Sequence, residues 1–323
     1  MRYAVIGAGA MGSLAALLLH DAGMEVTVYE RREERRADLK AKGIRVRGVL
    51  QGEAFLEVGA AGEAAPPFDV IILAVSARES GAALRPISPF VHRDTVYVSM
   101  QDGNAVSALA GLVGEGRTCA ILSWASACES AEGEVEVEGL LSFVLGSFGP
   151  GAKTAIGGLA EALSAACPGK VTLTGDLGGE IWRRLEAAAA VSGLCAVAGA
   201  VPQEARSLEG ISTLCEEAAG ECRKTASGEG REYQVPLNPW EDAVWKGVEP
   251  PLLRDIETGR KTEAAFLSGY IVQQARSAGV DVPVHSAVLS LVREMESGLR
   301  SPGEATQKEL IRRIEEERGM SLF

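Results

Sequence analysis

Three glycines near the start of the chain have the spacing of a phosphate-binding loop. Gly7, Gly9 and Gly12 form a G-x-G-x-x-G pattern that directly follows the apolar run 3–6 and opens a helical pattern. In that context the first glycine permits a tight turn, the second lets the backbone approach a pyrophosphate, and the third lets helix and strand pack closely. The segment is predicted to bind a dinucleotide through Gly7, Ala8, Gly9, Ala10, Met11 and Gly12.

The residues that end the second predicted strand distinguish NAD from NADP. An acidic side chain at this place accepts a hydrogen bond from the ribose of NAD, and Glu30 is available. Arg31 follows at once, and residues 29–47 contain eight basic and four acidic side chains in a chain of net charge -12. This local surplus favours NADP, with Arg31 on the 2′-phosphate. An exposed helix face with i to i+4 ion pairs explains residues 35–42 equally well.

The elements that must position this loop alternate between β-type runs and helical patterns up to about residue 175. Such alternation is typical of βαβ units around a largely parallel sheet. A strictly alternating run, Glu134–Glu138, followed by Leu141–Leu145 predicts a hairpin at the edge of the sheet. The other predicted strands are Tyr3–Gly7, Glu25–Tyr29, Asp69–Val75, Thr95–Met100 and Arg117–Trp124.

Helical periodicity replaces the β-type runs after Thr174, which places a domain boundary near Gly175. The fold class is therefore predicted to be α/β: a Rossmann-type doubly wound sheet in residues 1–175, followed by an all-helical domain in residues 176–323. The predicted helices are Gly179–Ala198, Ser207–Ser227, Asn238–Glu257, Thr262–Ser277, Ser286–Ser297 and Glu304–Arg318.

Composition excludes several other classes of function. The chain has 32 basic and 44 acidic residues, so we expect neither nucleic acid nor a membrane surface as a partner. The 3 histidines lie far apart and the 6 cysteines form no C-x-x-C pair, which predicts no metal site and reduced thiols. The spaced glycines argue against a signal peptide, and we expect a cytoplasmic protein without a transmembrane segment.

Further motifs along the chain resemble those of ketopantoate reductases. They are Q-D-G at 101–103, E-I-W-R-R-L at 180–185, the segment 255–263, Gly269, and G-V-D-V-P at 279–283. Together with the glycine loop and Arg31, they follow the family's order over almost the whole chain. The resemblance implies reduction of 2-dehydropantoate to pantoate with NADPH, for pantothenate and coenzyme A biosynthesis, by a Rossmann domain and a helical domain.

The resemblance also assigns catalytic residues. The family's lysine, which donates a hydrogen bond and a proton to the keto oxygen, corresponds to Arg184, and the family's substrate-side carboxylate is kept as Glu263. Arginine keeps the charge and the donors but does not release a proton near neutral pH. Arg184 would polarise the keto oxygen and Glu263 would orient the substrate or a water. A structural ion pair between these two residues is the alternative.

Other family positions have changed. The family's substrate-binding asparagines correspond to Ala188 and Ser192, and the asparagine of its Q-N-G turn, next to cofactor and substrate, corresponds to Asp102. The cofactor-binding lysine after the third strand corresponds to Ser76. These changes leave open an enzyme that acts on a different oxo acid or an imine, or a nucleotide-binding protein that has lost catalysis. A monomer and a homodimer are both compatible with the sequence.

Four residues near these motifs have simpler predicted roles. His285, beside Pro283 at a helix start, is predicted to be a cap or a surface residue. Trp182, Trp240 and Trp245 are predicted to belong to the hydrophobic core.

Overall fold

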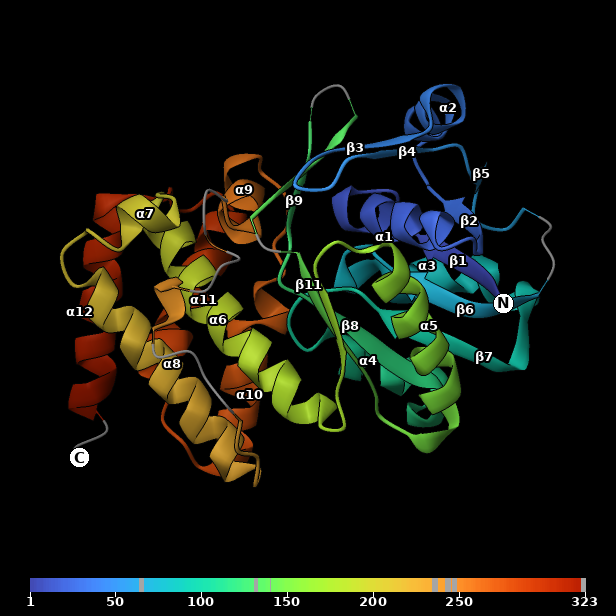
Figure 1. Ribbon diagram of the computed structural model, residues 1–323. Coiled ribbons are helices and arrows are strands. Elements are labelled where there is room, and N and C mark those ends of the chain that lie inside the picture. The colour runs from blue at the N-terminus through green and yellow to red at the C-terminus, as the bar shows by residue number, and fades with distance from the viewer. Residues whose placement is uncertain are drawn as a thin grey trace. The chain divides into compact units, whose positions relative to one another are not determined.

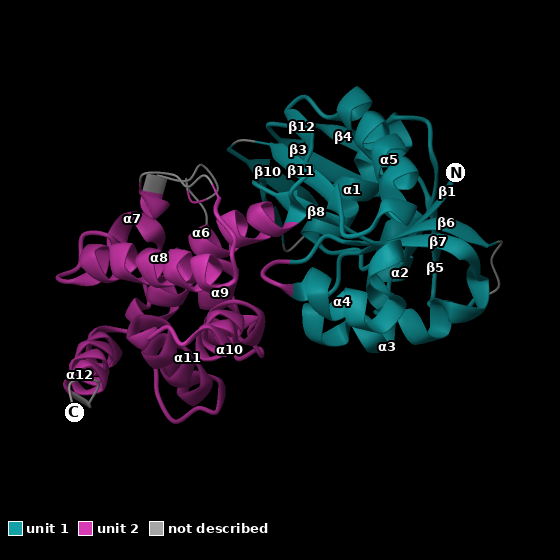
Figure 2. Cartoon of the chain, turned by 90° about the horizontal axis from the view of Figure 1, so that it is seen from below, with its two compact units in different colours: residues 1–101, 105–177 teal, residues 102–104, 178–323 magenta. Residues whose placement is uncertain are grey.

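The computed structural model describes residues 1–63, 67–130, 133–139, 141–233, 238–241, 245 and 249–320. The chain divides into two compact units, which Figure 2 shows in different colours. Unit 1 comprises residues 1–101 and 105–177, and unit 2 comprises residues 102–104 and 178–323. Unit 1 contains the sheets and unit 2 is helical, which confirms the predicted fold class.

Unit 1 is built on an eight-stranded sheet with the order β12-β11-β8-β7-β6-β1-β2-β5 (Figure 1). Every neighbouring pair is parallel except β11 and β8. The chain continues from β1 to one side through β2 and returns to the other side through β6, so the glycine loop after β1 lies at a topological switch point. The strands are β1 (Arg2–Ile6), β2 (Glu25–Tyr29), β5 (Glu57–Gly59), β6 (Phe68–Leu73), β7 (Val91–Ser99), β8 (Thr118–Ser123), β11 (Ser142–Ser147) and β12 (Lys170–Leu173).

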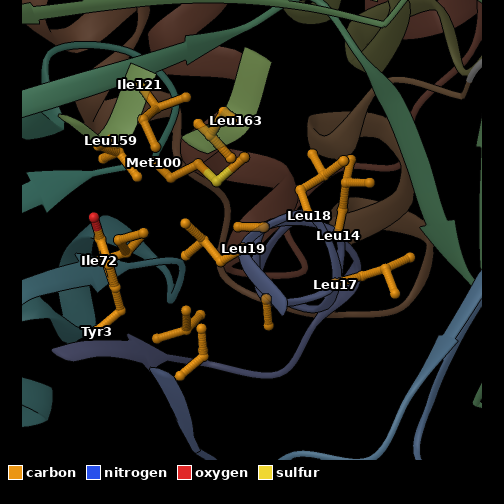
Figure 3. Packing of buried hydrophobic residues seen from close by; sticks show 14 of the residues in the cluster. Tyr3, Leu14, Leu17, Leu18, Leu19, Ile72, Met100, Ile121, Leu159 and Leu163 are labelled. Carbon is orange, nitrogen blue, oxygen red and sulfur yellow. The ribbon is translucent and has the colours of Figure 1, made fainter. Parts of the chain in front are cut away.

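Helices cover both faces of this sheet, because the central strands are apolar on both faces. Val5 lies in a core cluster with the leucines of α1 and α5, part of which Figure 3 shows. Its neighbour Ile6 points to the opposite face and belongs to a second cluster with Leu109 of α4. The helices of unit 1 are α1 (Ala10–Asp21), α2 (Glu33–Lys42), α3 (Ser80–Leu84), α4 (Ala105–Val113) and α5 (Lys153–Ala166).

The predicted hairpin of residues 134–138 and 141–145 is wrong. The first run forms β10 (Val135–Glu138), which pairs with β3 and β9 in a separate four-stranded sheet of order β4-β3-β10-β9. The second run forms β11 in the large sheet, and residue 140 between the runs lies outside the described residues. The alternation arises because Val135 and Val137 pack into the cluster of α1. The remaining strands, β3 (Ile44–Gly48), β4 (Gly52–Ala54) and β9 (Ser126–Glu129), are absent from the sequence prediction.

Unit 2 is organised around α6, whose residues 184–198 are buried on all sides. A helix that is buried all round is a central helix of a core, although α6 also carries the buried polar residues Arg184, Glu186 and Ser192. In the described part of unit 2, one cluster of 35 buried hydrophobic residues includes residues of α6 and three tryptophans. None of the described helices is long and apolar enough to cross a membrane. The helices are α6 (Leu177–Ala198), α7 (Pro202–Ala205), α8 (Ile211–Gly228), α9 (Pro251–Glu257), α10 (Ser268–Ala278), α11 (Pro283–Glu296) and α12 (Glu304–Met320).

Two helices of unit 2 are shorter than predicted. The predicted helix 238–257 is wrong in its described part, where Pro239–Glu241 and Trp245 are 3₁₀ and the α-helix α9 begins only at Pro251. Pro250 and Pro251 explain the late start, since proline fits the first turn of a helix but not its interior. The predicted helix 262–277 begins only at Ser268, after the 3₁₀ helix η7 (Ala264–Phe266).

His285 is not the cap or surface residue that the sequence suggests, because it is only 1% exposed. Its Nε2 donates to the carbonyl oxygen of Ala218 at 2.9 Å, which leaves Nδ1 as the acceptor for the Ser268 hydroxyl at 3.3 Å. Burial lowers the pKa of His285 to about 4, and the hydrogen bond to Ala218 opposes this shift only in part. The folded protein therefore holds a neutral imidazole in its core.

The buried imidazole should make stability depend on pH on the acid side. Between about pH 6.5 and pH 4 the unfolded chain binds a proton at residue 285 and the folded chain does not, so acidification favours unfolding. Over that window we expect the contribution of His285 to the free energy of unfolding to fall by about 3 kcal/mol. Urea unfolding at a series of pH values should therefore show that the unaltered protein loses more stability on acidification than the His285→Asn variant, by about this amount.

The two proteins must be compared because Glu221 titrates in the same pH window, and its titration changes the free energy of unfolding in the opposite direction. Its carboxylate accepts the backbone N–H groups of Val284 and His285, and burial raises its pKa to about 7. Stability from Glu221 is present below its ordinary pKa and is lost as the pH rises toward 7. The exposed His20 provides the control, because His20→Asn should leave the pH slope unchanged. An identical slope in His285→Asn would contradict the prediction.

Candidate active site

The glycine loop has the backbone geometry that a bound pyrophosphate needs. Gly7 has a φ of 101°, and a Cβ at Gly12 would lie 1.9 Å from the Gly7 carbonyl oxygen. A Cβ at Gly9 would meet nothing within 4 Å, so the space beside this residue is open. Gly9 also caps the N-terminus of α1 without a side-chain hydrogen bond. The first turn of α1 therefore presents backbone N–H groups and its positive dipole end to an anion.

Glu30, at the end of β2, lies directly against this loop. One carboxylate oxygen accepts the Ala8 N–H at 3.2 Å, and the other accepts the backbone N–H of Arg32 at 2.9 Å. The Arg32 side chain also donates to both oxygens, at 3.1 Å each. Burial alone would raise the pKa of Glu30, but its hydrogen bonds and the charge of Arg32 outweigh this and lower it. Glu30 is therefore ionised, and Arg32 compensates its charge.

The arginines that follow β2 differ in their surroundings. The side chain of Arg31 is 80% exposed and lies 3.0 Å from Glu79, whereas Arg36 donates to the carbonyl oxygens of Glu30 and Arg31 and holds the strand end in place. Arg35 is buried, and its Nη1 donates to the carbonyl of Gly133 at 2.9 Å. The alternative of a solvated helix face is therefore wrong for Arg35.

Ser76, predicted to bind the cofactor, follows β6 and begins a short 3₁₀ turn. This loop is held by Gln101, whose side-chain amide donates to the Val75 carbonyl at 2.8 Å and to Ser80 Oγ at 2.9 Å. The sequence analysis treats Gln101 only as part of the Q-D-G landmark. The supporting role of Gln101 could have been predicted from its side-chain amide and from its position directly after a buried strand.

In unit 2 the structure brings Asp102 and Arg184 together. Arg184 Nη2 donates to Asp102 Oδ1 at 2.8 Å, although 82 residues separate them in the sequence. The arginine side chain is 9% exposed and the aspartate side chain is 39% exposed. The ion partner of Arg184 is therefore the residue of the Q-D-G turn, and no sequence pattern points to this pair.

Two more predicted substrate residues share a face of α6 with Arg184. Ala188 and Ser192 follow it at intervals of four, and both are buried. Arg184 Nε and Nη1 and Ser192 Oγ are buried and make no hydrogen bond within the described part of the chain. Buried polar atoms are nearly always satisfied, so these donors are available to a polar ligand or to ordered water.

Glu263 begins the turn η7, beside the Q-D-G turn. Its carbonyl accepts the Phe266 N–H at 2.8 Å, and the Phe266 carbonyl accepts the Asn104 N–H at 3.0 Å. Glu263 is half-buried and its Oε2 atom is buried. The two turns that carry Asp102 and Glu263 are therefore joined through one backbone hydrogen bond.

Comparison with known proteins gives matches in both units. Residues 3–150 match the family model for ketopantoate reductase PanE/ApbA, and residues 176–296 match the model for its C-terminal part. This chain belongs to the ketopantoate reductase family. It is therefore an oxidoreductase that acts on a keto or CH–OH group of a small molecule.

Relatives in the ketopantoate reductase family match over nearly the whole chain. The uncharacterised oxidoreductase YkpB of Bacillus subtilis is 25% identical over 312 residues, 92% of this chain and 99% of that protein. The 2-dehydropantoate 2-reductase of Vibrio cholerae is 25% identical over 92% of this chain and 98% of that protein. A solved D-mandelate dehydrogenase with NADH and anilino(oxo)acetate has a TM-score of 0.81 at 23% identity, covering 93% of this chain and 99% of that one, which shows a shared fold.

Proposed function

We propose that this protein is an NADPH-dependent reductase of a 2-oxo acid, with the cofactor held by unit 1 and the keto acid held by Arg184, Ser192 and Glu263 of unit 2. The observation that carries the proposal is the row of buried donors on α6, Arg184 Nε, Arg184 Nη1 and Ser192 Oγ. A 2-oxo acid offers several oxygen acceptors to such donors. When bound, the nicotinamide supplies the hydride that reduces the keto carbon.

In this scheme Arg184 stabilises the negative charge that develops on the keto oxygen. Arginine stays protonated at working pH, so it acts as a fixed donor and not as the acid. The proton then comes from Glu263 in its protonated form or from a water that Glu263 orients. The buried surroundings of Arg184 strengthen the interaction, because few waters compete for its N–H groups.

The residues of unit 1 support NADPH as the cofactor. The charge of Glu30 is compensated by Arg32, so the strand end does not present a free carboxylate to a 2′-phosphate. Among the described residues, the Arg31 side chain is paired only with the exposed carboxylate of Glu79, an ion pair that contributes little and can be exchanged for a phosphate. NADH is the second candidate, because Glu30 lies against the Ala8 N–H where a ribose hydroxyl would also bind, and the D-mandelate dehydrogenase structure contains NADH.

Replacing Arg31 by alanine should remove most of the preference for NADPH over NADH. A hydrogen bond from arginine to phosphate is charge-assisted, and its loss should cost about 1.5 to 3 kcal/mol of NADPH binding with no change for NADH. Fluorescence titrations of both cofactors measure this. Arg93→Ala is the matched control, because Arg93 is an exposed arginine of unit 1 paired with Asp94. Equal affinities of the unaltered protein for both cofactors would mean that Glu30 binds the ribose hydroxyls and that Arg31 does not recognise a 2′-phosphate.

The substrate test is a panel of 2-oxo acids in which the absorbance of NADPH is followed. We expect turnover of at least one acid, and slow turnover of ketopantoate, because the family's polar contacts are changed at Asp102, Ala188 and Ser192. Each buried polar group of a substrate that lacks its partner costs about 1 to 3 kcal/mol. Ketopantoate turnover at about 10 s⁻¹ or above, near the median for enzymes, would show that other residues bind it. Oxidation of NADPH by none of the acids would refute the proposed function.

A further inference from the structure

Asp102 and Arg184 come from segments far apart in the sequence and meet in one ion pair. Arg184 Nη2 lies 2.8 Å from Asp102 Oδ1, although 82 residues separate the two. Both residues belong to unit 2, so the contact is a feature of that unit.

Burial explains why the arginine needs an acidic partner. The Arg184 side chain is 9% exposed, and removing a guanidinium from water is costly unless an anion compensates it. An asparagine at position 102 would accept a hydrogen bond but would supply no charge. Asp102 supplies both, and a charge-assisted hydrogen bond is roughly twice as strong as a neutral one.

The contact also fixes the direction of the remaining N–H groups of Arg184. The guanidinium is planar and rigid, so holding Nη2 sets where Nε and Nη1 point. These two atoms are buried and make no hydrogen bond among the described residues. Lysine, whose three donors rotate about one bond, would not need such alignment.

The backbone around Asp102 is itself fixed by close contacts, so its carboxylate can fix the orientation of Arg184. Gly103 has a φ of 68°, and a Cβ there would lie 2.2 Å from the Phe266 carbonyl oxygen. The next residue, Asn104, donates its N–H to that same oxygen at 3.0 Å. The turn is therefore seated against η7, and only glycine permits this close approach.

We propose that Asp102 is a positioning residue, which aims the free N–H groups of Arg184 at the oxygens of the substrate and compensates part of its charge. Asp102 acts through Arg184 and is not a direct ligand of substrate or cofactor. Asp102 and Arg184 therefore act as one functional unit. The identity of the substrate rests on the proposed function. The ion pair itself does not, because both of its residues belong to unit 2.

A double-mutant cycle with the best 2-oxo acid of the panel tests this role. Asp102→Asn should lower kcat by about tenfold or more with little change in KM, because a small misplacement of a catalytic group is costly. In the Arg184→Lys background the same substitution should change kcat by less than about twofold, a coupling that independent residues do not show. Equal losses in both backgrounds, or a raised KM with unchanged kcat, would overturn the proposal.

Glu180→Gln is the matched control, because Glu180 forms an ion pair of the same length, 2.8 Å, with Arg183 on the same helix. It should leave kcat unchanged. Thermal unfolding of all variants identifies any loss of activity that comes from unfolding.

A second readout does not depend on turnover. In a ¹H–¹⁵N spectrum of the arginine side chains, the Nε–H signal of Arg184, assigned by its disappearance in Arg184→Lys, should be sharp and slow to exchange. Asp102→Asn should broaden this signal, and Glu180→Gln should not. An unchanged signal in Asp102→Asn would overturn the positioning role. If the panel contains no substrate, the proposed function fails, and this spectrum alone decides the inference.

Discussion

Arg184→Ala should lower kcat for an active 2-oxo acid by about a hundredfold or more. Losses of that size are found when one donor to a developing oxyanion is removed. Here the effect should be large, because the buried Nε and Nη1 groups of Arg184 have no other hydrogen-bond partner among the described residues. Steady-state rates of NADPH oxidation at saturating substrate measure the change directly.

Arg184→Lys separates the electrostatic role from a structural one. Lysine keeps the positive charge and donors, so this variant should retain activity within about tenfold of the unaltered protein. A lysine loses its proton near pH 10, so kcat should fall as the pH rises toward that value, a limb that arginine does not produce. If Arg184→Ala were as active as the unaltered protein, Arg184 would be only half of a structural ion pair with Asp102.

The sequence was sufficient for the parts of the fold in which the pattern is local and strong. The central strands are apolar on both faces, and α1 follows β1 with a clear helical period, so their existence could be read from residue types alone. The four-stranded sheet could not, because its strands are short and carry charged side chains such as Arg45, Arg47 and Glu53. Pairing partners such as β10 and β3 are also far apart in the chain.

The same distinction applies to the candidate site. The glycine loop is contiguous, and its three glycines have the close contacts or open space that the motif predicts. The ion partner of Arg184 was not predictable, since the family resemblance pointed to Glu263 and no residue pattern singles out Asp102, in a turn 82 residues away. The buried position of His285 was missed because its partners, Ala218 and Ser268, are on other helices.

Two alanine substitutions in the glycine loop should both weaken cofactor binding, but only one of them should lower stability. A Cβ at Gly12 would lie 1.9 Å from the Gly7 carbonyl oxygen and 3.1 Å from Ala74 Cβ, so Gly12→Ala must push α1 away from β1. We expect a loss of about 3 kcal/mol of unfolding free energy, the upper end of the range for overpacked cores, and loss of cofactor binding with it.

Gly9→Ala tests phosphate binding alone. Gly9 has a φ of −75°, which alanine adopts readily, and its Cβ would meet nothing in the protein within 4 Å, so stability should be unchanged or slightly higher. The methyl group would instead occupy the space through which a pyrophosphate approaches α1, and affinity for NADPH should fall by about tenfold or more. Gly111→Ala on α4 is the control, since it also meets nothing within 4 Å and lies outside the loop. Thermal unfolding and NADPH titration of the three variants measure both quantities. Unchanged affinity in Gly9→Ala would mean that the cofactor phosphates do not bind at the start of α1, because nothing else in the folded protein would have been altered.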